Sequence, residues 1–255
     1  MAGDGENHPR GGDHPAGINP AARCTPLVNS VHQMTTTAPE PITLPMMRET
    51  LYSAVVCDAL DGLGYRNQSP RVELKPLTVD TVLLGRCKTT LWVAMAHDDP
   101  RPYEKELLAV DSCRPDDVFI AAAAGSMHSG LWGELLSTAA RNAGCVGAIV
   151  DGAVRDVRQT MAMQFPVFAR GTCVYDRQNR HRVVDIDVPV EIDRVPFRPG
   201  DLVIADVDGV VVVPREIEQE AVRAAWNKVH AENVTRDAIQ AGMKTTDAYR
   251  KYGVL

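Results

Sequence analysis

The sequence predicts an α/β fold. Residues 130–156 have the pattern of a helix that starts after a glycine turn, ends at a glycine and is followed by an apolar strand. Residues 81–96 and 116–125 have the Val, Leu, Thr and Trp content expected of strands in a half-buried sheet. Residues 214–242 have the pattern of a long helix. Helices and strands therefore alternate, but strands outnumber those of a simple βαβ repeat.

The composition is that of a globular protein. A chain of 255 residues with 45% hydrophobic content can bury a full core. The net charge of −6 comes from interspersed acidic and basic residues, and no basic stripe indicates a nucleic-acid partner. No apolar run is long enough to span a membrane, so no membrane partner is expected.

The six cysteines indicate neither a zinc site nor a disulfide framework. None belongs to a CxxC pair, and most lie inside apolar runs. The first residues lack the charged-then-apolar pattern of a secretion signal. We therefore expect the protein to be cytoplasmic.

Residues 1–40 differ from the rest of the chain. They are rich in Gly, Pro, His, Asn and Thr and show no helical or strand periodicity, which predicts a disordered extension. The remaining residues, 41–255, are expected to form a single domain that includes the C-terminal helix.

The first half of this domain predicts helices followed by strands. Residues 46–64 carry apolar side chains at helical spacing and end in two glycines, which indicates one or two helices. The strands of residues 81–96 and 116–125 follow. Within the first of them, Gly85 is expected to mark a bulge or bend.

The second half predicts further strands and the long helix. Residues 165–171 resemble a strand, residues 182–195 alternate polar and apolar side chains as an antiparallel strand does, and residues 202–214 read as a hairpin. The long helix places Glu232 and Arg236 on its apolar stripe. Two explanations remain open: an internal ion pair, or a helix that delivers Glu232 to a site on another subunit.

The glycine turn at Gly133, before the helix predicted within residues 130–156, suggests an anion site. If a helix starts at Gly133, the backbone N–H groups of Leu135 and Leu136 have no intrahelical partner and can hold a carboxylate or phosphate. Many helices begin with glycine and bind nothing, so the turn alone is weak evidence.

The motif DGAVRD strengthens the suggestion. We expect it to form a turn that sets Asp151, Arg155 and Asp156 close together. Asp156 is a hard oxygen ligand suited to Mg²⁺ or Mn²⁺, and Arg155 offers a fork of donors to a carboxylate or a developing oxyanion. Glu134 precedes Arg155 by a helix and a strand, which can return the chain to the same edge. The alternative is a structural ion pair between Arg155 and either aspartate.

These motifs resemble a known family. The run GELLSTAARNAGCVGAIVDGAVRD, together with FPVFARG, PGDLVIADVDGVVVVP and VVCDALDGLG, resembles the class II pyruvate aldolases of the RraA-like family. That family includes 4-hydroxy-4-methyl-2-oxoglutarate aldolases with oxaloacetate decarboxylase activity, and also regulators of ribonuclease activity. The resemblance covers about residues 45–245 and implies a layered αββαβ sandwich of the swivelling β/β/α type, assembled as a homotrimer or hexamer.

The resemblance also implies roles for individual residues. Asp156 would carry Mg²⁺ or Mn²⁺, and Glu134 would contact a water on that metal. A small 2-oxo acid would be held by Arg155 and by the backbone of the turn at Gly133, Leu135 and Leu136. In the aldolase branch a glutamate of a neighbouring subunit joins the site, and Glu232 is the residue that we match to it.

The implied activity is a metal-dependent carbon–carbon lyase. Such an enzyme would cleave a 4-hydroxy-2-oxo acid to pyruvate and would decarboxylate oxaloacetate. Two alternatives remain. The first is a different 2-oxo or sugar acid, selected by a pocket wall around Asp58, Asn67, His128 and Trp132. The second is a non-catalytic regulator of RNA processing, although the chain retains the acidic residue and the Arg-Asp pair that mark the enzymes.

Overall fold

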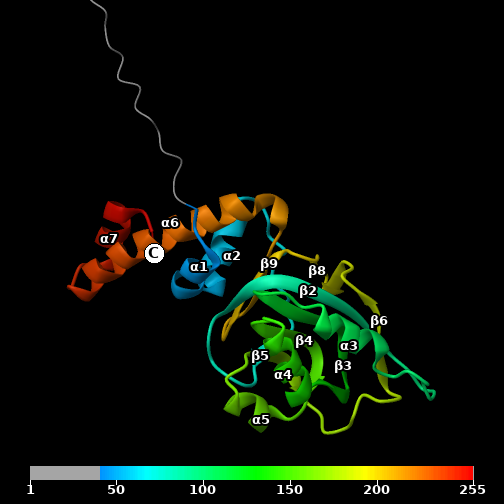
Figure 1. Cartoon of the computed structure of the whole chain (residues 1–255). Helices are drawn as coiled ribbons and strands as arrows, with labels where there is room; N and C mark the ends of the chain where they lie inside the picture. Colours follow the sequence, from blue (N-terminus) through cyan, green and yellow to red (C-terminus); the bar gives the residue numbers. More distant parts are fainter. Residues whose placement is uncertain (1–40, 255) are drawn as a thin grey trace, which may run out of the picture. The chain divides into compact units, whose positions relative to one another are not determined.

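Four parallel strands form the centre of an eight-stranded sheet in the computed structural model, which describes residues 41–254 (Figure 1). The predicted extension, residues 1–40, lies outside the described residues. Each of the four strands pairs with the next in the chain. They are β2 (Leu83–Ala94), β3 (Asp117–Trp132), β4 (Gly147–Val154) and β5 (Val167–Thr172).

Antiparallel strands complete the sheet. The first half of β2 pairs with β9 and the second half with β6, so one long strand carries two partners on the same edge. The remaining strands are β1 (Lys75–Pro76) beside β5, β6 (His181–Ile186), the hairpin of β9 (Leu202–Asp206) and β10 (Gly209–Val213), and a separate hairpin of β7 (Val190–Ile192) and β8 (Val195–Phe197). The predicted hairpin around Asp208 and Gly209 is confirmed.

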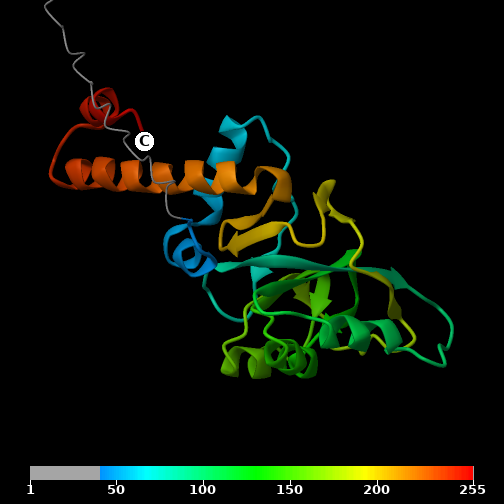
Figure 2. The same ribbon diagram turned by 45° about the horizontal axis from the view of Figure 1, so that its top comes forward.

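The helices lie in two groups, on opposite sides of the strands (Figure 2). One group consists of α3 (Glu104–Asp111), α4 (Glu134–Asn142) and α5 (Val157–Ala162). The other consists of α1 (Leu44–Thr50), α2 (Ser53–Gly62), the 3₁₀ turn Arg215–Ile217, α6 (Glu218–Gln240) and α7 (Thr245–Tyr252).

Three hydrophobic clusters separate the layers. The first lies between α3 and α4 and the parallel strands and includes Phe119 and Leu136. The second joins those strands to the β9–β10 and β7–β8 hairpins through residues such as Phe168 and Phe197. The third joins β9 and β10 to α1, α2 and α6 and includes Leu60. Helix, strand, strand and helix layers therefore follow one another, which confirms the predicted layered α/β sandwich.

Two local features differ from the predictions. The bulge of β2 lies between Leu91 and Trp92 rather than at Gly85, and the alternative of a bend at Gly85 stays a prediction. A Cβ at Gly85 would stand 2.3 Å from the carbonyl oxygen of Asp116, so glycine is needed there for close backbone approach. The residues of DGAVRD do not form a turn, because β4 continues to Val154.

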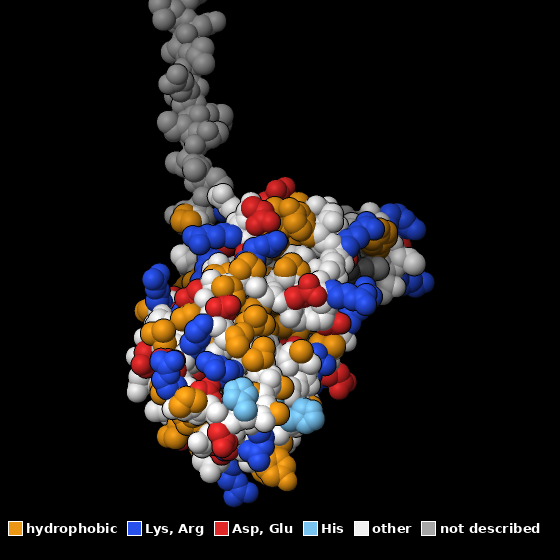
Figure 3. Space-filling view, turned by 90° about the vertical axis from the view of Figure 1, so that its right-hand side faces the viewer, with side chains coloured by type: hydrophobic (Ala, Val, Ile, Leu, Met, Phe, Trp, Pro, Cys, Tyr) orange, Lys and Arg blue, Asp and Glu red, His pale blue; other side chains and the backbone are white. Residues whose placement is uncertain are grey.

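Acidic and basic side chains are interspersed on the face that Figure 3 shows. Within residues 41–254, the cysteines are free thiols. No helix in this part of the chain has the length and apolar character needed to cross a bilayer.

A buried ion pair ties α3 to the loop that follows β5. Glu106 of α3 is 1% exposed and forms a two-atom contact with the guanidinium of Arg177. Burial raises the pKa of the Glu106 carboxyl, and Arg177 acts in the opposite direction. The pair therefore holds the loop against α3, because separating the two side chains would leave a buried charge without its partner.

We expect Gly85→Ala to lower the free energy of unfolding by about 1–3 kcal/mol, because the added methyl group overlaps the backbone of Asp116. Gly62→Ala is the matched control: a Cβ there meets no atom within 4 Å, and alanine should raise helix stability by up to about 1 kcal/mol. Urea denaturation of both variants measures the difference. Equal stabilities would contradict the close approach at Gly85.

We expect Arg177→Ala to lower the free energy of unfolding by about 3–5 kcal/mol at pH 7, since Glu106 would remain buried without its cation. Loss of Arg177 raises the folded-state pKa of Glu106 further above its unfolded value. The destabilisation caused by Arg177→Ala should therefore be small below the pKa that Glu106 has in the unfolded chain, and it should grow as the pH rises above that value. Urea denaturation from pH 4 to 8 measures it, and Arg180→Ala, at an exposed arginine of the same loop, is the control.

Candidate active site

The candidate site begins at the amino-terminal end of α4. Gly133 is the N-cap residue and provides no side-chain cap, so the first backbone N–H groups of the helix have no intrahelical partner. The side chain of Leu135 is 78% exposed there, whereas Leu136 packs into the core. Glu134 stands in the first turn, where its Oε1 accepts a hydrogen bond of 2.8 Å from the Thr138 hydroxyl.

The carboxylate of Asp156 lies directly against this helix end. A Cβ at Gly133 would stand 2.5 Å from Asp156 Oδ2, so only glycine leaves room for the carboxylate. Asp156 itself has the left-handed backbone conformation, with φ of 55°, between the end of β4 and α5. A strained backbone here is consistent with a functional position.

Arg155 is held in place by main-chain and side-chain contacts. Its N–H donates to the carbonyl oxygen of Trp132 at 2.9 Å, which joins the ends of β3 and β4. A Cβ at Gly130 would stand 2.9 Å from Arg155 Cβ, so a second glycine admits the arginine. The guanidinium then lies 3.5 Å from Asp156 and 3.0 Å from Asp176.

Asp176 is a site residue that the sequence did not indicate. Burial acts to raise its pKa, but the backbone N–H of Gln178 and the charges of Arg155 and Arg177 outweigh it, so the pKa of Asp176 lies below its ordinary value. The residue comes from the polar loop after β5, which has no motif spacing. Only the fold brings it to Arg155.

These residues line one cavity of about 350 Å³. Five predicted site residues meet there, namely Gly133, Leu135, Leu136, Arg155 and Asp156. The other lining residues are Tyr103, Leu107, Val110, Asp111, Ala139, Asp176 and Arg177. Glu134 is in the first turn of the same helix but is not among the lining residues.

Asp151 does not belong to this site. It lies inside β4, where its side chain is 2% exposed, and its Oδ1 accepts from Arg170 Nε at 2.6 Å. Its Oδ2 accepts from the N–H of Gly125. The expected grouping of Asp151 with Arg155 and Asp156 is therefore wrong, because β4 stays extended to Val154 and carries Arg155 and Asp156 away from Asp151, which pairs with Arg170.

The single chain does not bring Glu232 to the cavity. Its Oε2 accepts a hydrogen bond from the Tyr52 hydroxyl, and Lys228 and Arg236 lie 3.9 and 4.0 Å away on the same helix. Burial and this hydrogen bond raise the pKa of Tyr52 to about 12. The internal ion pair considered for Glu232 is present, and a role on another subunit stays a prediction.

The donor set suits a divalent cation held by one carboxylate. Within residues 41–254, no group of three or more His, Cys, Asp or Glu side chains is placed to hold a metal. Asp156 is 40% exposed, opens into the cavity and touches a helix end that offers N–H groups to a substrate anion. Mg²⁺ is commonly held by one or two carboxylates, with waters and substrate oxygens as further ligands, so the site fits that metal.

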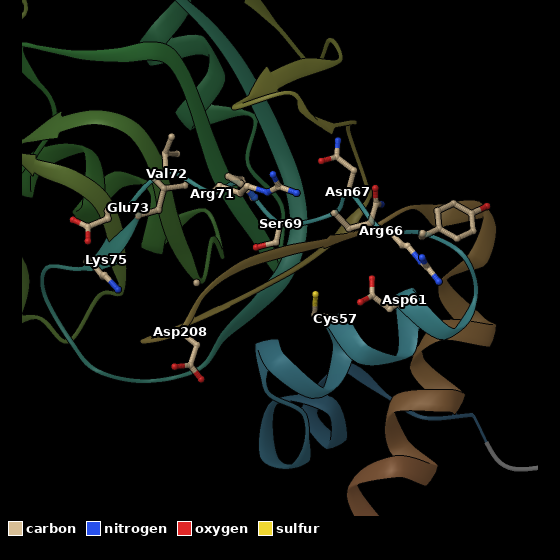
Figure 4. Close-up of a pocket in the computed structure, with 15 residues that line it drawn as sticks. Cys57, Asp61, Arg66, Asn67, Ser69, Arg71, Val72, Glu73, Lys75 and Asp208 are labelled. Atoms are coloured by element: carbon tan, nitrogen blue, oxygen red, sulfur yellow. The ribbon is translucent and has the colours of Figure 1, made fainter. Parts of the chain in front are cut away.

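A second cavity, of about 380 Å³, lies between the end of α2, residues 65–75 and the β9–β10 turn (Figure 4). Its cations are equal in number to its carboxylates: Arg66, Arg71 and Lys75 stand with Asp61, Glu73 and Asp208. It contains none of the predicted catalytic or metal residues. The cavity of Arg155 is therefore the candidate site.

The pocket wall expected around Asp58, Asn67, His128 and Trp132 is not formed in the single chain. Asn67 lines the second cavity, and Asp58 pairs with Lys228. Trp132 is 1% exposed and donates through Nε1 to the Ser137 hydroxyl, so it serves the core. The actual wall comes from α3, which the sequence analysis did not predict.

Comparison with known proteins agrees with this architecture. The family model described as "RraA-like: Aldolase/RraA" matches residues 53–212. A protein of Halalkalibacterium halodurans, named "Putative 4-hydroxy-4-methyl-2-oxoglutarate aldolase", is 32% identical over 200 residues, which are 78% of this chain and 90% of that protein.

Two solved structures share the fold. An uncharacterized protein from Pseudomonas syringae pv. tomato has a TM-score of 0.70 and 26% identity, covering 82% of this chain and 98% of that one. RraAS2 of Streptomyces coelicolor, described as an unusual member of the RNase ES inhibitor RraA protein family, has a TM-score of 0.67 and 29% identity, covering 76% and 94%. Fold, motifs and the matched residues together show that this chain belongs to the RraA-like family.

Proposed function

We propose that the protein is a divalent-metal-dependent lyase that cleaves a 4-hydroxy-2-oxo acid to pyruvate, with oxaloacetate decarboxylation as a second activity. One observation supports this most: the start of α4, Arg155 and Asp156 open into one cavity. This arrangement offers a metal ligand, a permanent cation and free N–H groups at the same place. A 2-oxo acid presents a carboxylate and a keto oxygen, which are the groups that such a site can hold.

In this proposal the residues divide the work. Asp156 would hold Mg²⁺ or Mn²⁺, which supplies Lewis-acid stabilisation of charge on the keto oxygen. The N–H groups of Leu135 and Leu136 bind the substrate carboxylate, and Gly133 keeps the backbone accessible. Arg155 neutralises the negative charge that develops on the keto oxygen as the C3–C4 bond breaks.

Proton transfer falls to the glutamates. Cleavage requires loss of the proton from the C4 hydroxyl, while the C3–C4 electron pair passes to the pyruvate enolate and C3 is later protonated. Glu134 stands at the helix end beside the cavity and accepts this proton through a water. Decarboxylation of oxaloacetate releases CO₂ and needs no such base, so it depends on Arg155 and Asp156 but not on Glu134.

The setting that we propose follows the family. Residues 41–255 form the catalytic domain and assemble as a homotrimer or hexamer, with sites near subunit interfaces. Glu232 of a neighbouring subunit joins the proton-transfer network. The protein works in the cytoplasm on a small 2-oxo acid and requires neither nucleic acid nor membrane.

A second candidate is a regulator of RNA processing, because a structurally similar protein is described as a member of an RNase inhibitor family. A third is a lyase for a different 2-oxo or sugar acid. A regulator needs no carboxylate that binds a metal, whereas a lyase for either kind of acid does. Turnover of a 2-oxo acid therefore distinguishes a lyase from a regulator of RNA processing.

We expect pyruvate release from a panel of 4-hydroxy-2-oxo acids and from oxaloacetate, dependent on Mg²⁺ or Mn²⁺. Arg155→Ala and Asp156→Ala should each lower kcat/KM by about a hundredfold or more, since each removes charge stabilisation in the transition state. Arg158→Ala, at an exposed arginine beside them, should change it little. Full activity without metal, or in either site variant, would exclude the mechanism, and a folded protein inactive on the whole panel would favour the regulator.

We expect subunits that carry Glu232→Ala, mixed with subunits that carry Arg155→Ala, to recover part of the aldolase activity that each lacks alone. The reason is that a mixed oligomer contains some sites with both residues intact. Refolding the two variants together, then measuring pyruvate release, tests this. The control is a mixture of Glu134→Ala with Arg155→Ala subunits, which should recover no activity because both residues belong to the same subunit's site. If the two mixtures release pyruvate equally, Glu232 lies outside the site.

A further inference from the structure

Arg177 lines the cavity of Arg155 and has donors that its pair with Glu106 does not use. Its Nε donates to Glu106 Oε2, and its Nη2 lies against Oε1. A guanidinium carries five N–H donors in one plane, so this contact occupies one edge and leaves both donors of Nη1 and one of Nη2. Among the described residues, no group accepts a hydrogen bond from Nη1. Arg177 can therefore bind a ligand without leaving Glu106.

The surroundings of Arg177 fix the direction of its guanidinium. The side chain is 11% exposed, and its Cζ lies 4.7 Å from the centre of the Tyr103 ring, which lines the same cavity. The group is thus held on one edge by a carboxylate and on its face by an aromatic ring. A donor fork that is already fixed loses little side-chain entropy when a ligand binds.

Arg177 also stands next to the residues that hold Arg155. The Asp176 carboxylate, one residue before Arg177, lies 3.0 Å from the guanidinium of Arg155. The two arginines line one cavity of about 350 Å³, a size typical of sites that enclose a whole small ligand. The proposed function assigns Arg155 and Asp156 to the 2-oxo acid end of the substrate. The far end of the substrate is therefore the part that can meet Arg177.

Two carboxylates near Arg177 do not take its free donors. Asp176 accepts from the N–H of Gln178 and from the Tyr103 hydroxyl through Oδ1, and its Oδ2 faces Arg155. Asp111 lines the cavity from an exposed position, where water and salt screen its charge. The outer edge of Arg177 is therefore open to an anion.

We propose that Arg177 is a specificity residue that binds a second carboxylate of the substrate, at the end remote from the 2-oxo group. This inference rests on the proposed function and adds a residue to its site. Arg177 keeps its pair with Glu106 while it binds, because different edges of the guanidinium serve the two carboxylates. Charge-assisted N–H···O bonds to a planar anion favour a dicarboxylic 2-oxo acid over an analogue that ends in a methyl group.

Binding of two analogues that cannot undergo aldol cleavage tests the inference. 2-Oxoglutarate and 2-oxopentanoate have the same chain length and the same 2-oxo acid end, and they differ in carboxylate against methyl at C5. We expect isothermal titration of the full-length protein with Mg²⁺ or Mn²⁺ to give a Kd for 2-oxoglutarate that is lower by about tenfold or more. Equal affinities, or tighter binding of 2-oxopentanoate, would overturn the proposal.

A double variant removes Arg177 without leaving a buried charge unpaired. Glu106→Leu combined with Arg177→Met replaces the ion pair by apolar side chains, an exchange that is often neutral for stability. We expect the Kd for 2-oxopentanoate to change by less than about twofold, whereas the preference for 2-oxoglutarate is lost. A preference that persists in the double variant would overturn the role of Arg177 and would indicate a cation from a neighbouring subunit.

Two further variants serve as controls. Glu106→Gln removes the buried charge but keeps Arg177, so the preference for 2-oxoglutarate should remain; its loss would mean that the pair acts by placing the loop, which would overturn binding by Arg177. Arg180→Met removes an exposed arginine of the same loop that does not line the cavity, and it should leave the affinity ratio unchanged. A loss equal to that of the double variant would reduce the effect to the general charge of the loop and overturn the proposal.

Turnover separates this inference from the proposed function. Pyruvate release by a protein in which Arg177 has no effect on the affinity ratio overturns the inference and leaves the lyase standing. A preference for 2-oxoglutarate that depends on Arg177, in a protein that releases no pyruvate, supports a binding site for dicarboxylic 2-oxo acids and overturns the lyase.

Discussion

The close approach of β3 and β4 at their carboxyl ends is the constraint on which the candidate site depends. The hydrogen bond from Arg155 N–H to Trp132 joins the two strand ends. Glycines at 130 and 133 then leave space for the Arg155 side chain and the Asp156 carboxylate. Parallel strands place their carboxyl ends at one edge of a sheet, so the helix that starts after β3 meets the residues that follow β4. A larger side chain at either glycine would separate the helix end from the Arg-Asp pair.

Electrostatic pairing decides how the rest of the cavity is used. Arg155 lies between two carboxylates, and Arg177 is committed to Glu106 in the interior. The buried pair has a structural role, since it holds the loop after β5 against α3 and thereby places Asp176 beside Arg155. The pairing of Arg177 with the buried Glu106 therefore fixes the position of the loop that completes the site, because breaking this pair is costly. The charges that we propose for catalysis, Arg155 and Asp156, are more exposed than the structural pair of Arg177 and Glu106.

Much of the fold and part of the site can be predicted from sequence because their signals are local. The Gly144 stop and the β9–β10 hairpin depend on glycines with positive φ, and the α4 start is marked by Gly133 directly before a helical pattern. Asp176, Arg177 and the α3 wall could not be found in this way. They lie on a polar loop and on a short helix of mixed composition, and their roles come from contacts with residues far along the chain.

The sequence by itself determined the layered α/β class, the helix start at Gly133 and the candidate pair Arg155 and Asp156, because periodicity, glycine placement and the family motifs are all carried by contiguous residues. Only the tertiary structure decided which charges share the cavity. It removed Asp151, which faces Arg170 inside β4, and it added Asp176 and Leu107. The physical reason is that β4 stays extended to Val154 and so separates Asp151 from Arg155 along the strand, and that loops reach a site through long-range pairing rather than through spacing.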